Sequence, residues 1–592
     1  MAYEANFFAS RWALFRPTLI SAGLVFAGCE NADFSAHQVQ TASHASAAVA
    51  PATESGIDSP LGNYLAGRLA RKENDVAAAA AYFERALDED PENSDLMRET
   101  FLATLFEGRV EDAVSLARRL HERGSTGPYT SLVLAVHELK NENFTEARTR
   151  LKKIKRRGYN VLLVPLMTAW TQVGLGDYEA AHKALDRLSN TQAFAAFQDF
   201  HGALIDDFSG NNEAAEAAYL RVLERQPGGT MRSVAALGGF YERLGRDADA
   251  AKLYQSYQEN NPDSVSFQQA LERIESGQPA TALVTEARTG AAEALFGVAN
   301  ALFQENALEP ALIYARISIY LRRDSDASHL FVGQVLESLG RSQQAIDAYR
   351  SVSRSSPLFW SARLRVATSL DSLDRTDEAL KELSAMASER AERADALITI
   401  GDLLRSKQRW TEAASAYDRA FNRIESLERR HWRPLYARGI SLERSQQWDR
   451  AEADFLKALE LEPNQPFVLN YLGYSWVDQG THLQRALKMI ERAVDLRPND
   501  GYIIDSLGWA LFRLGEFEDA VTHLERAVEL RPDDPTINDH LGDAYWRVGR
   551  LVEARFQWSR ALVLEPEEDQ ISGIESKIAN GLSTDPQREG NI

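Results

Sequence analysis

The chain has 592 residues, of which 44% are hydrophobic and 26% are charged, an ordinary composition for a folded protein. Its 86 acidic and 66 basic residues give a net charge of −20, which argues against wrapping of nucleic acid and against broad docking on anionic lipid. The single cysteine, Cys29, excludes an internal disulfide and a zinc site built from several cysteines.

The first 28 residues have the pattern of an export signal peptide. Arg11 and Arg16 give a basic start, residues 18–26 form an apolar run, and residues 27 and 28 are small, as a signal peptidase requires. The apolar run is shorter than the ~20 residues that a membrane-spanning helix needs. Residues 1–28 are therefore predicted to be a cleaved leader.

The residues around Cys29 resemble the lipobox of bacterial lipoproteins. The segment Phe26-Ala27-Gly28-Cys29 matches the usual Leu-Ala-Gly-Cys form except that Phe26 replaces Leu. The resemblance implies cleavage before Cys29 and lipidation of its thiol and new amino group, which would hold the protein firmly at a membrane. Glu30 stands where an Asp commonly causes inner-membrane retention, so we expect an outer-membrane lipoprotein that faces the periplasm. The alternative is a plain secretory leader with an incidental cysteine.

A tether is predicted between this leader and the folded body. Residues 29–59 are rich in Ala, Ser, Thr and His and show no apolar periodicity, which is typical of a flexible segment.

From residue 60 onward, small residues recur together with a large apolar residue and a proline. The first such repeat contains Gly67, Ala79, Phe83, Ala86 and Pro91. Residues 60–264 are predicted to form an N-terminal arm of these repeats, and residues 265–289 are predicted to be an irregular insert that divides it from a second arm.

The second arm, predicted to cover residues 290–568, shows the repeat most clearly. Four landmarks recur 34 residues apart, namely Gly508 and Gly542, Ala520 and Ala554, Ala527 and Ala561, and Pro532 and Pro566. They resemble the tetratricopeptide repeat (TPR), a helix–turn–helix unit of 34 residues. A glycine within the first helix lets the second helix come close, and the proline ends the second helix. Residues 569–592 are predicted to form a capping helix and a tail.

The predicted fold is therefore all-α. It is a right-handed superhelical TPR solenoid of about fourteen helix–turn–helix repeats, arranged in two arms.

Catalytic and cofactor motifs are missing from the sequence. It contains no Gly-x-x-x-x-Gly-Lys phosphate loop, no His-Glu-x-x-His zinc helix and no Gly-x-Ser-x-Gly elbow. We therefore expect a protein that is not an enzyme and that needs no metal or cofactor.

In TPR proteins the first helix of each repeat lines the concave face. The positions that point into this groove carry aromatic, Arg and hydrogen-bonding side chains, which are typical of binding hot spots. The predicted partner-binding groove consists of Tyr436, Asn470, Tyr474, Asp505, Trp509, Phe512, Arg513, Asp539, Asp543, Trp546 and Arg547.

Asn470 matches the Asn with which TPR carboxylate clamps grip a peptide C-terminus. Asp505 and Asp539 occupy that position in the later repeats, so a basic or mixed segment is a better expected ligand than a terminal carboxylate. The alternative is that Trp509, Phe512 and Trp546 pack against neighbouring repeats.

Three segments of the C-terminal arm resemble a group of Gram-negative TPR lipoproteins of similar length. They are Leu-Asn-Tyr-Leu-Gly-Tyr at 469–474, Asp-Ser-Leu-Gly-Trp-Ala at 505–510, and Asn-Asp-His-Leu-Gly-Asp-Ala-Tyr-Trp at 538–546. In that group, one adaptor brings cell-wall hydrolases to a periplasmic carboxyl-terminal processing protease. The resemblance implies a tethered adaptor that binds a periplasmic serine protease and its substrates. A structural subunit of an envelope assembly or polysaccharide or protein export machine remains the alternative, and an accessory hydrolase is disfavoured by the missing motifs.

Overall fold

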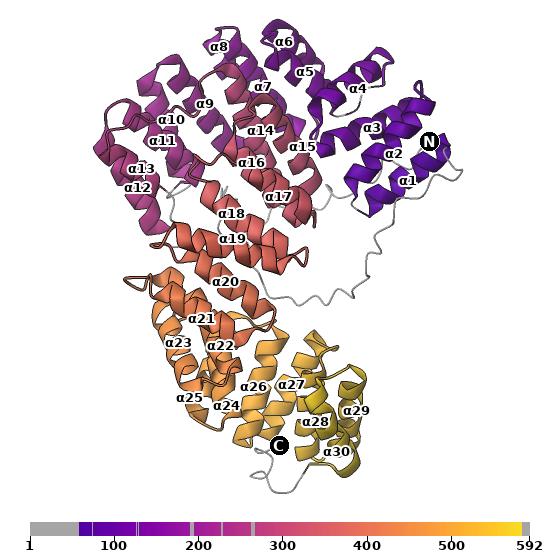
Figure 1. The fold of residues 1–592 in the computed structure, drawn as a ribbon, viewed down its shortest axis with the longest axis vertical. Helices are drawn as coiled ribbons and strands as arrows, with labels where there is room; N and C mark the ends of the chain where they lie inside the picture. Colours follow the sequence, from indigo (N-terminus) through magenta and orange to yellow (C-terminus); the bar gives the residue numbers. More distant parts are fainter. Residues whose placement is uncertain are drawn as a thin grey trace. The chain divides into compact units, whose positions relative to one another are not determined.

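The structure of the chain is a computed structural model that describes residues 59–73, 75–125, 127, 129–189, 194–225, 229–261 and 267–582. The predicted signal peptide, Cys29 and the predicted tether up to residue 58 lie outside the described residues, as does the predicted tail from residue 583. In the described part all regular structure is helical, and thirty α-helices follow one another, mostly as hairpins (Figure 1). The predicted all-α fold of helix–turn–helix repeats is confirmed.

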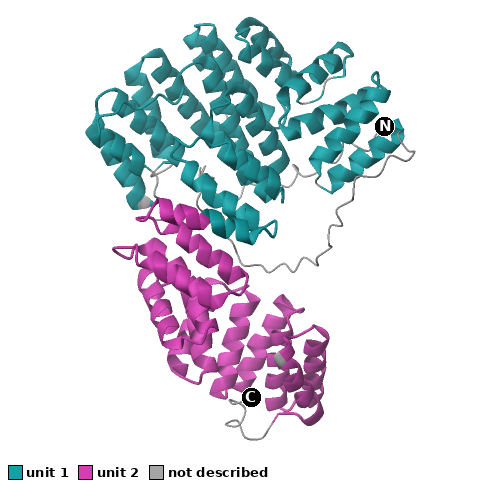
Figure 2. Ribbon diagram, viewed as in Figure 1, with its two compact units in different colours: residues 1–382 teal, residues 383–592 magenta. Residues whose placement is uncertain are grey.

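The chain divides into two compact units, residues 1–382 (unit 1) and 383–592 (unit 2), which meet within one helix (Figure 2). Unit 1 begins with an arm of six hairpins. Its helices are α1 (Pro60–Lys72), α2 (Val76–Glu89), α3 (Ser94–Glu107), α4 (Val110–Glu122), α5 (Thr130–Lys140), α6 (Phe144–Lys153), α7 (Asn160–Gly174), α8 (Tyr178–Leu185), α9 (Ala195–Ser209), α10 (Asn212–Arg225), α11 (Met231–Arg243) and α12 (Asp247–Asn260), with a short 3₁₀ turn η1 (Asp186–Leu188).

Unit 1 does not end where this arm ends. It continues through α13 (Gln268–Glu275), α14 (Ala287–Gln304), α15 (Leu308–Leu321), α16 (Asp326–Ser338), α17 (Ser342–Arg350), α18 (Phe359–Asp371) and the first part of α19 (Thr376–Glu389). The interval 265–289, predicted to separate two arms, thus lies inside unit 1. Its described residues form α13, which packs on α12, and a non-helical stretch that leads into α14.

Unit 2 consists of five further hairpins and a final helix. They are α20 (Asp395–Ser406), α21 (Trp410–Phe421), α22 (Trp432–Arg444), α23 (Trp448–Leu461), α24 (Pro466–Asp478), α25 (Leu483–Leu496), α26 (Gly501–Leu514), α27 (Phe517–Leu530), α28 (Pro535–Arg547), α29 (Leu551–Val563) and α30 (Glu568–Asn580), with a 3₁₀ turn η3 (Arg429–His431) before α22. Helix α30 packs on α29.

The glycine within the first helix of a repeat has its predicted role. A Cβ added to Gly439 would lie 2.5 Å from the ring of Phe455, and one added to Gly473 would lie 2.7 Å from the side chain of Ile490. Real Cβ contacts are not this short. The large, fully buried side chain of the second helix, here Phe455 or Ile490, therefore fits only against a glycine. The same relation to a buried side chain holds for Gly67, Gly238, Gly333, Gly401, Gly508 and Gly542.

The ends of the second helices also follow the sequence pattern. Helices α23, α25, α27 and α29 stop two or three residues before Pro463, Pro498, Pro532 and Pro566. The one repeat with an extra residue absorbs it in the turn between α24 and α25, where Gly480 and His482 have φ of 68° and 49°. None of the helices in the described ranges combines the length and apolar character that crossing a bilayer requires.

Candidate protein-binding surface

The first helices of consecutive repeats form one face, which we call the inner face. In unit 2, α20 contacts α22, α24 contacts α26, and α26 contacts α28, whereas the second helices make no comparable contacts with one another in the described part. A stack of helix pairs curves toward the side on which the helices are closer together, so the inner face is the concave side.

The inner face of the N-terminal arm is covered by a later part of the same chain. Helix α14 packs against α7 and α9, and α15 packs against α3, α4 and α5 (Figure 1). The α14–α15 hairpin therefore lies where a partner protein would bind in an open solenoid. This arrangement was not predicted from the sequence.

Close packing joins α14 to the arm. A Cβ added to Gly290 would overlap the indole of Trp170, which is fully buried and donates a hydrogen bond from Nε1 to His201 Nδ1 at 3.1 Å. Burial lowers the pKa of His201 to about 4, so this histidine is neutral and can accept that bond.

A buried ion pair reinforces the same contact. Arg232 Nε, at the start of α11, donates to Glu293 Oε1 on α14 at 2.7 Å. Burial alone would raise the pKa of the Glu293 carboxyl, but the Arg232 guanidinium outweighs it and holds that pKa below its usual value. Removing either partner would leave a buried charge uncompensated.

Polar contacts join α15 to the arm at the other end of the hairpin. The Tyr320 hydroxyl lies 2.8 Å from His137 Nδ1 and donates to Glu111 Oε2 at 3.0 Å. Lys140 Nζ lies 3.6 Å from the centre of the Tyr320 ring and pairs with Glu111 at 2.7 Å. These residues lie on α4 and α5 of the arm and on α15 of the hairpin, so their contacts hold the hairpin against the arm.

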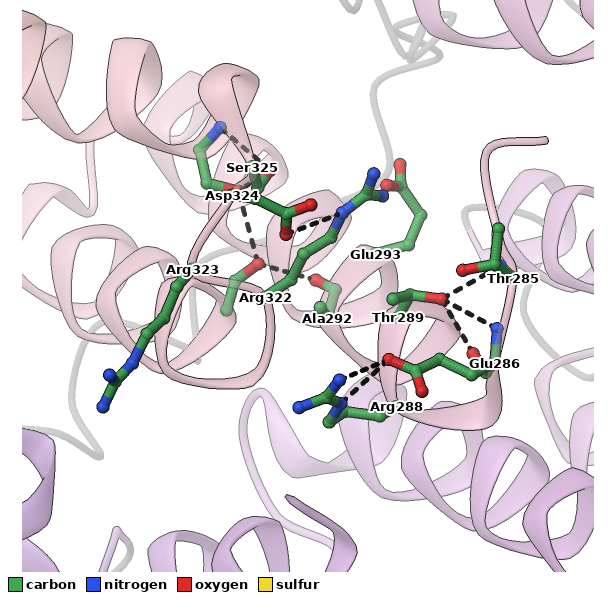
Figure 3. Close-up of polar contacts among 12 residues, drawn as sticks. Thr285, Glu286, Arg288, Thr289, Ala292, Glu293, Arg322, Arg323, Asp324 and Ser325 are labelled. Atoms are coloured by element: carbon green, nitrogen blue, oxygen red, sulfur yellow. Dashed lines mark hydrogen bonds and ion pairs between the residues drawn. The ribbon is translucent and has the colours of Figure 1, made fainter. Parts of the chain in front are cut away.

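The start of α14 is itself well capped (Figure 3). The Thr289 hydroxyl donates to the Glu286 carbonyl at 2.8 Å and accepts from the Thr285 and Glu286 amides at 3.2 Å, while Arg288 binds the Glu286 carboxylate at 2.6 Å. The hairpin therefore enters the inner face from a fixed direction rather than from a loose loop.

Among the described residues of unit 2, no later hairpin covers the inner face of the central repeats. Tyr436 is half-buried against Phe455 and Tyr471, with ring centroids 6.0 and 5.9 Å away. Asn470 and Tyr474 on α24 are also half-buried. Asn470 Oδ1 is enclosed without a hydrogen-bond partner among the described residues.

Trp509 on α26 is the centre of an aromatic stack on this face. Its ring lies parallel to Phe512 at 5.0 Å and to His540 at 4.2 Å. The guanidinium of Arg513 lies 6.0 Å from the Trp509 ring, and Arg513 also donates to the Asp478 carbonyl at 3.3 Å. Trp509 Nε1 is a buried donor for which the described residues supply no acceptor. A buried donor in this state is costly unless something else accepts its hydrogen bond.

Asp505 is buried and belongs to the fold of this face rather than to its accessible surface. Its carboxylate accepts a hydrogen bond from His540 Nδ1 at 3.0 Å. Burial would lower the pKa of His540, but the Asp505 carboxylate outweighs it, and the pKa of His540 is raised. The His540 ring in turn stacks on Trp509 and fixes that ring.

The acidic residues at the last repeat pair with a lysine of the same chain. Lys577 on α30 reaches back and binds Asp539 at 2.7 Å and Asp543 at 2.8 Å, and Trp558 Nε1 donates to Asp543 at 2.8 Å. Burial raises the pKa of Asp543 to about 6 despite Lys577, and the two carboxylates overcome the effect of burial on Lys577 and raise its pKa to about 12.

The remaining predicted groove residues are mostly packed. Phe512 is buried and meets Phe517 edge-on at 5.4 Å. The Trp546 ring lies 5.4 Å from Trp558, and a Cβ on Gly581 would overlap it, so the residues after α30 cover this ring. Arg547 is half-buried.

Family models of the tetratricopeptide repeat match residues 64–128, 203–265, 332–391, 367–423 and 432–465, and a TPR repeat model matches residues 508–549. Together these stretches cover half of the chain. The chain is a tetratricopeptide-repeat protein.

Known proteins similar to this TPR protein include one curated relative. The TPR repeat-containing protein PA4667 of Pseudomonas aeruginosa is 30% identical over 197 residues, which are 33% of this chain and 32% of the relative. The match thus spans about a third of that relative's length. Among solved structures, the APC/C hetero-tetramer Cut9–Hcn1 matches with a TM-score of 0.37 and 14% identity over 88% of this chain and 96% of that chain. Yeast Tom70 matches with a TM-score of 0.32 and 15% identity over 88% and 95%.

Five of the predicted groove residues remain accessible on the TPR inner face of unit 2. We call Tyr436, Asn470, Tyr474, Trp509 and Arg513 the inner-face cluster. Two residues that shape this cluster were not identified from the sequence. His540 supports it by stacking on Trp509, and Lys577 limits it by binding Asp539 and Asp543. Among the described residues, no group of three or more His, Cys, Asp and Glu side chains is arranged to hold a metal ion.

Proposed function

We propose that this TPR protein is a scaffold that binds a polypeptide segment of its partner at the inner-face cluster of unit 2. The observation that carries the proposal is the contrast between the two units. The inner face of the N-terminal arm is covered by α14 and α15, whereas on α22, α24 and α26 the half-buried aromatic and polar side chains of the inner-face cluster have no such cover among the described residues.

The chemistry of the cluster suits an extended polypeptide. The rings of Tyr436 and Trp509 offer flat apolar surface to side chains, and the half-buried Asn470 and Arg513 side chains can donate hydrogen bonds to main-chain carbonyl groups. Because Lys577 already pairs with Asp539 and Asp543, the cluster favours a segment of mixed charge over a strongly basic one.

At a finer level, we propose that the protein is tethered to the outer membrane through Cys29 and delivers substrates to a periplasmic carboxyl-terminal processing protease. The lipobox-like segment before Cys29 and the resemblance of residues 469–474, 505–510 and 538–546 to TPR lipoproteins support this role. A structural subunit of an envelope assembly or export machine is the second candidate, since it would use the same fold.

The docking site is tested by capture of partners from a bacterial envelope extract with the wild type, Asn470→Ala and a control, Gln484→Ala. Gln484 is an exposed amide on the outer helix of the same repeat. Since Asn470 Oδ1 has no partner within the described chain, its loss should leave the fold stable and weaken partner capture, while Gln484→Ala should bind normally. Equal capture by all three proteins would refute the inner-face site.

The identity of the captured proteins separates the two finer proposals. Recovery of a serine protease together with its substrates supports the adaptor role, and recovery of a secretion or assembly complex supports the alternative.

The anchor has its own test. Cys29→Ala should abolish labelling with a radioactive fatty acid and move the protein from the membrane fraction to the soluble fraction. An unlabelled wild-type protein would refute lipidation.

A further inference from the structure

The outer helix of the last repeat carries an exposed apolar stripe. On α29, Val552 is 80% exposed, Phe556 is 62% exposed and Val563 is 81% exposed. Together with the exposed Ser559 they recur at i, i+4, i+7 and i+11, which places them on one face of the helix. Large apolar side chains this exposed are uncommon as a contiguous stripe on a monomer.

The preceding repeats carry polar residues at the same places. Moving back 34 residues, the positions of Val552, Phe556 and Val563 are occupied on α27 by Glu518, Thr522 and Glu529. A further 34 residues back, on α25, they are occupied by Gln484, Lys488 and Asp495, and all six of these side chains are exposed. This face of a second helix is therefore not needed for stacking of the repeats, and its apolar character on α29 requires another explanation.

We propose that the stripe on α29 binds the same stripe of a second copy of this chain, with the two helices antiparallel. This surface lies on the second helices, so the proposal does not depend on the inner-face cluster.

The order of residues along the stripe is self-complementary. When two antiparallel stripes are centred on each other, Val552 faces Val563 of the second copy, and Phe556 faces Ser559. The large ring thus lies opposite the smallest side chain of the stripe, which lets the helices pack closely.

The charges along one edge of the stripe complement each other in the same register. Glu553 and Arg560 are seven residues apart and lie on the same side of the stripe. In the antiparallel pair, Glu553 comes within two residues, about 3 Å along the helix axis, of Arg560 of the second copy. Arg560 uses one nitrogen to bind the Pro532 carbonyl at 2.8 Å, and Glu553 uses Oε1 to pair with Arg550 at 3.2 Å, so the other donors of Arg560 can reach the second carboxylate oxygen of Glu553.

The size of the surface sets the strength of the contact. Helix α29 has 13 residues and is about 20 Å long, so one face of it supplies only part of the ~800 Å² per partner that a stable complex buries. We therefore expect a weak dimer that forms at high local concentration, as on a membrane surface.

Sedimentation velocity of the folded full chain, from low micromolar to several hundred micromolar, tests the proposal. The wild type should show a concentration-dependent monomer–dimer equilibrium, and Phe556→Lys should weaken it at least about tenfold. The matched control is Thr522→Lys, which adds the same charge at the equivalent exposed position of α27 and should leave the equilibrium unchanged. A wild type that stays monomeric throughout, or a dimer that Phe556→Lys leaves intact, would overturn the proposal.

Exchange of the edge charges tests the antiparallel register. Glu553→Arg and Arg560→Glu should each weaken the dimer, because each places like charges opposite one another, and the double variant should restore it. Circular dichroism and thermal melting confirm that each variant is folded. Failure of the double variant to recover association, with all variants folded, would overturn this register.

Discussion

The covered inner face of the N-terminal arm makes opposite predictions for two glycines of α14. Gly290 and Gly297 are seven residues apart and therefore lie on the same side of the helix, toward the arm. A Cβ on Gly290 would overlap the buried Trp170 indole, whereas a Cβ on Gly297 would lie 3.3 Å from Phe197 Cε1, which a small shift relieves.

The expected magnitudes follow from these contacts. Alanine in place of a mid-helix glycine gains about 1 kcal/mol from helix propensity, and overpacking of a tight core costs about 1–3 kcal/mol. Trp170 cannot move aside easily, because its Nε1 is bound to His201. We expect Gly290→Ala to destabilise unit 1 by about 1–2 kcal/mol and Gly297→Ala to be neutral or stabilising by up to about 1 kcal/mol.

Hydrogen exchange measures this difference locally, which suits a chain of two units whose melting need not be two-state. A net difference of about 2 kcal/mol between the variants corresponds to about 30-fold faster exchange of the α7 and α14 amides in Gly290→Ala than in Gly297→Ala. Faster exchange should stay confined to unit 1. If Gly290→Ala were as protected as Gly297→Ala, α14 would not be packed tightly in the inner face, and the assignment of partner binding to unit 2 would lose its basis.

Three further predictions concern buried polar groups. The pKa of His540 is raised above its unfolded value by Asp505, so its contribution to stability is complete below about pH 6.5 and is lost as the pH rises through the folded pKa. Unit 2 of the wild type should therefore lose more stability between about pH 6 and pH 8 than His540→Gln, measured by thermal melting. Lys577→Met should destabilise unit 2 by about 2–4 kcal/mol at about pH 8 and by less at about pH 5, where Asp543, with its pKa near 6, takes up a proton. Tyr320→Phe removes two hydrogen bonds between α15 and the arm and should cost unit 1 about 1 kcal/mol in urea unfolding.

The repeat itself could be predicted from the sequence because its determinants are local. A glycine such as Gly439 and the large side chain that packs against it, Phe455, are 16 residues apart within one hairpin, and the same pairing recurs along the chain. The fourteen hairpins found between α1 and α29 in the described residues match the predicted number, and even weakly marked repeats such as that around Ala113 form helix pairs with a fully buried alanine.

The cover over the N-terminal arm could not be predicted in the same way. Its contacts join residues far apart in the chain, such as Trp170 with Gly290 and His137 with Tyr320, and a single sequence contains no signal that pairs them. The composition of the two helices is consistent with this cover. Helices α14 and α15 have apolar or small residues on nearly all sides, and a helix of that kind must be buried all round.

Some predicted groove residues are accessible and others are covered, again because of contacts with distant parts of the chain. Position within the first helix predicts which side chains point inward, but not what lies over them. Lys577 reaches Asp539 and Asp543 from α30, beyond the last repeat, and Trp546 is covered by the residues that follow α30. The alternative prediction of packing against neighbouring elements thus describes Phe512 and Trp546, while Trp509 stacks on a neighbour and still keeps an unpaired donor.

The limits of the accessible face set the size of a partner segment. The capping helix closes the last repeat, so the inner-face cluster extends only across α22, α24 and α26. Neighbouring helices lie about 8–10 Å apart, so three first helices and their side chains span about 30 Å. An extended chain covers about 3.3 Å per residue, so a segment of about eight or nine residues would cross the whole cluster. The rest of the partner would then have to lie outside the cluster, so a short flexible segment of a larger protein suits this scaffold better than a folded domain seated in the inner face.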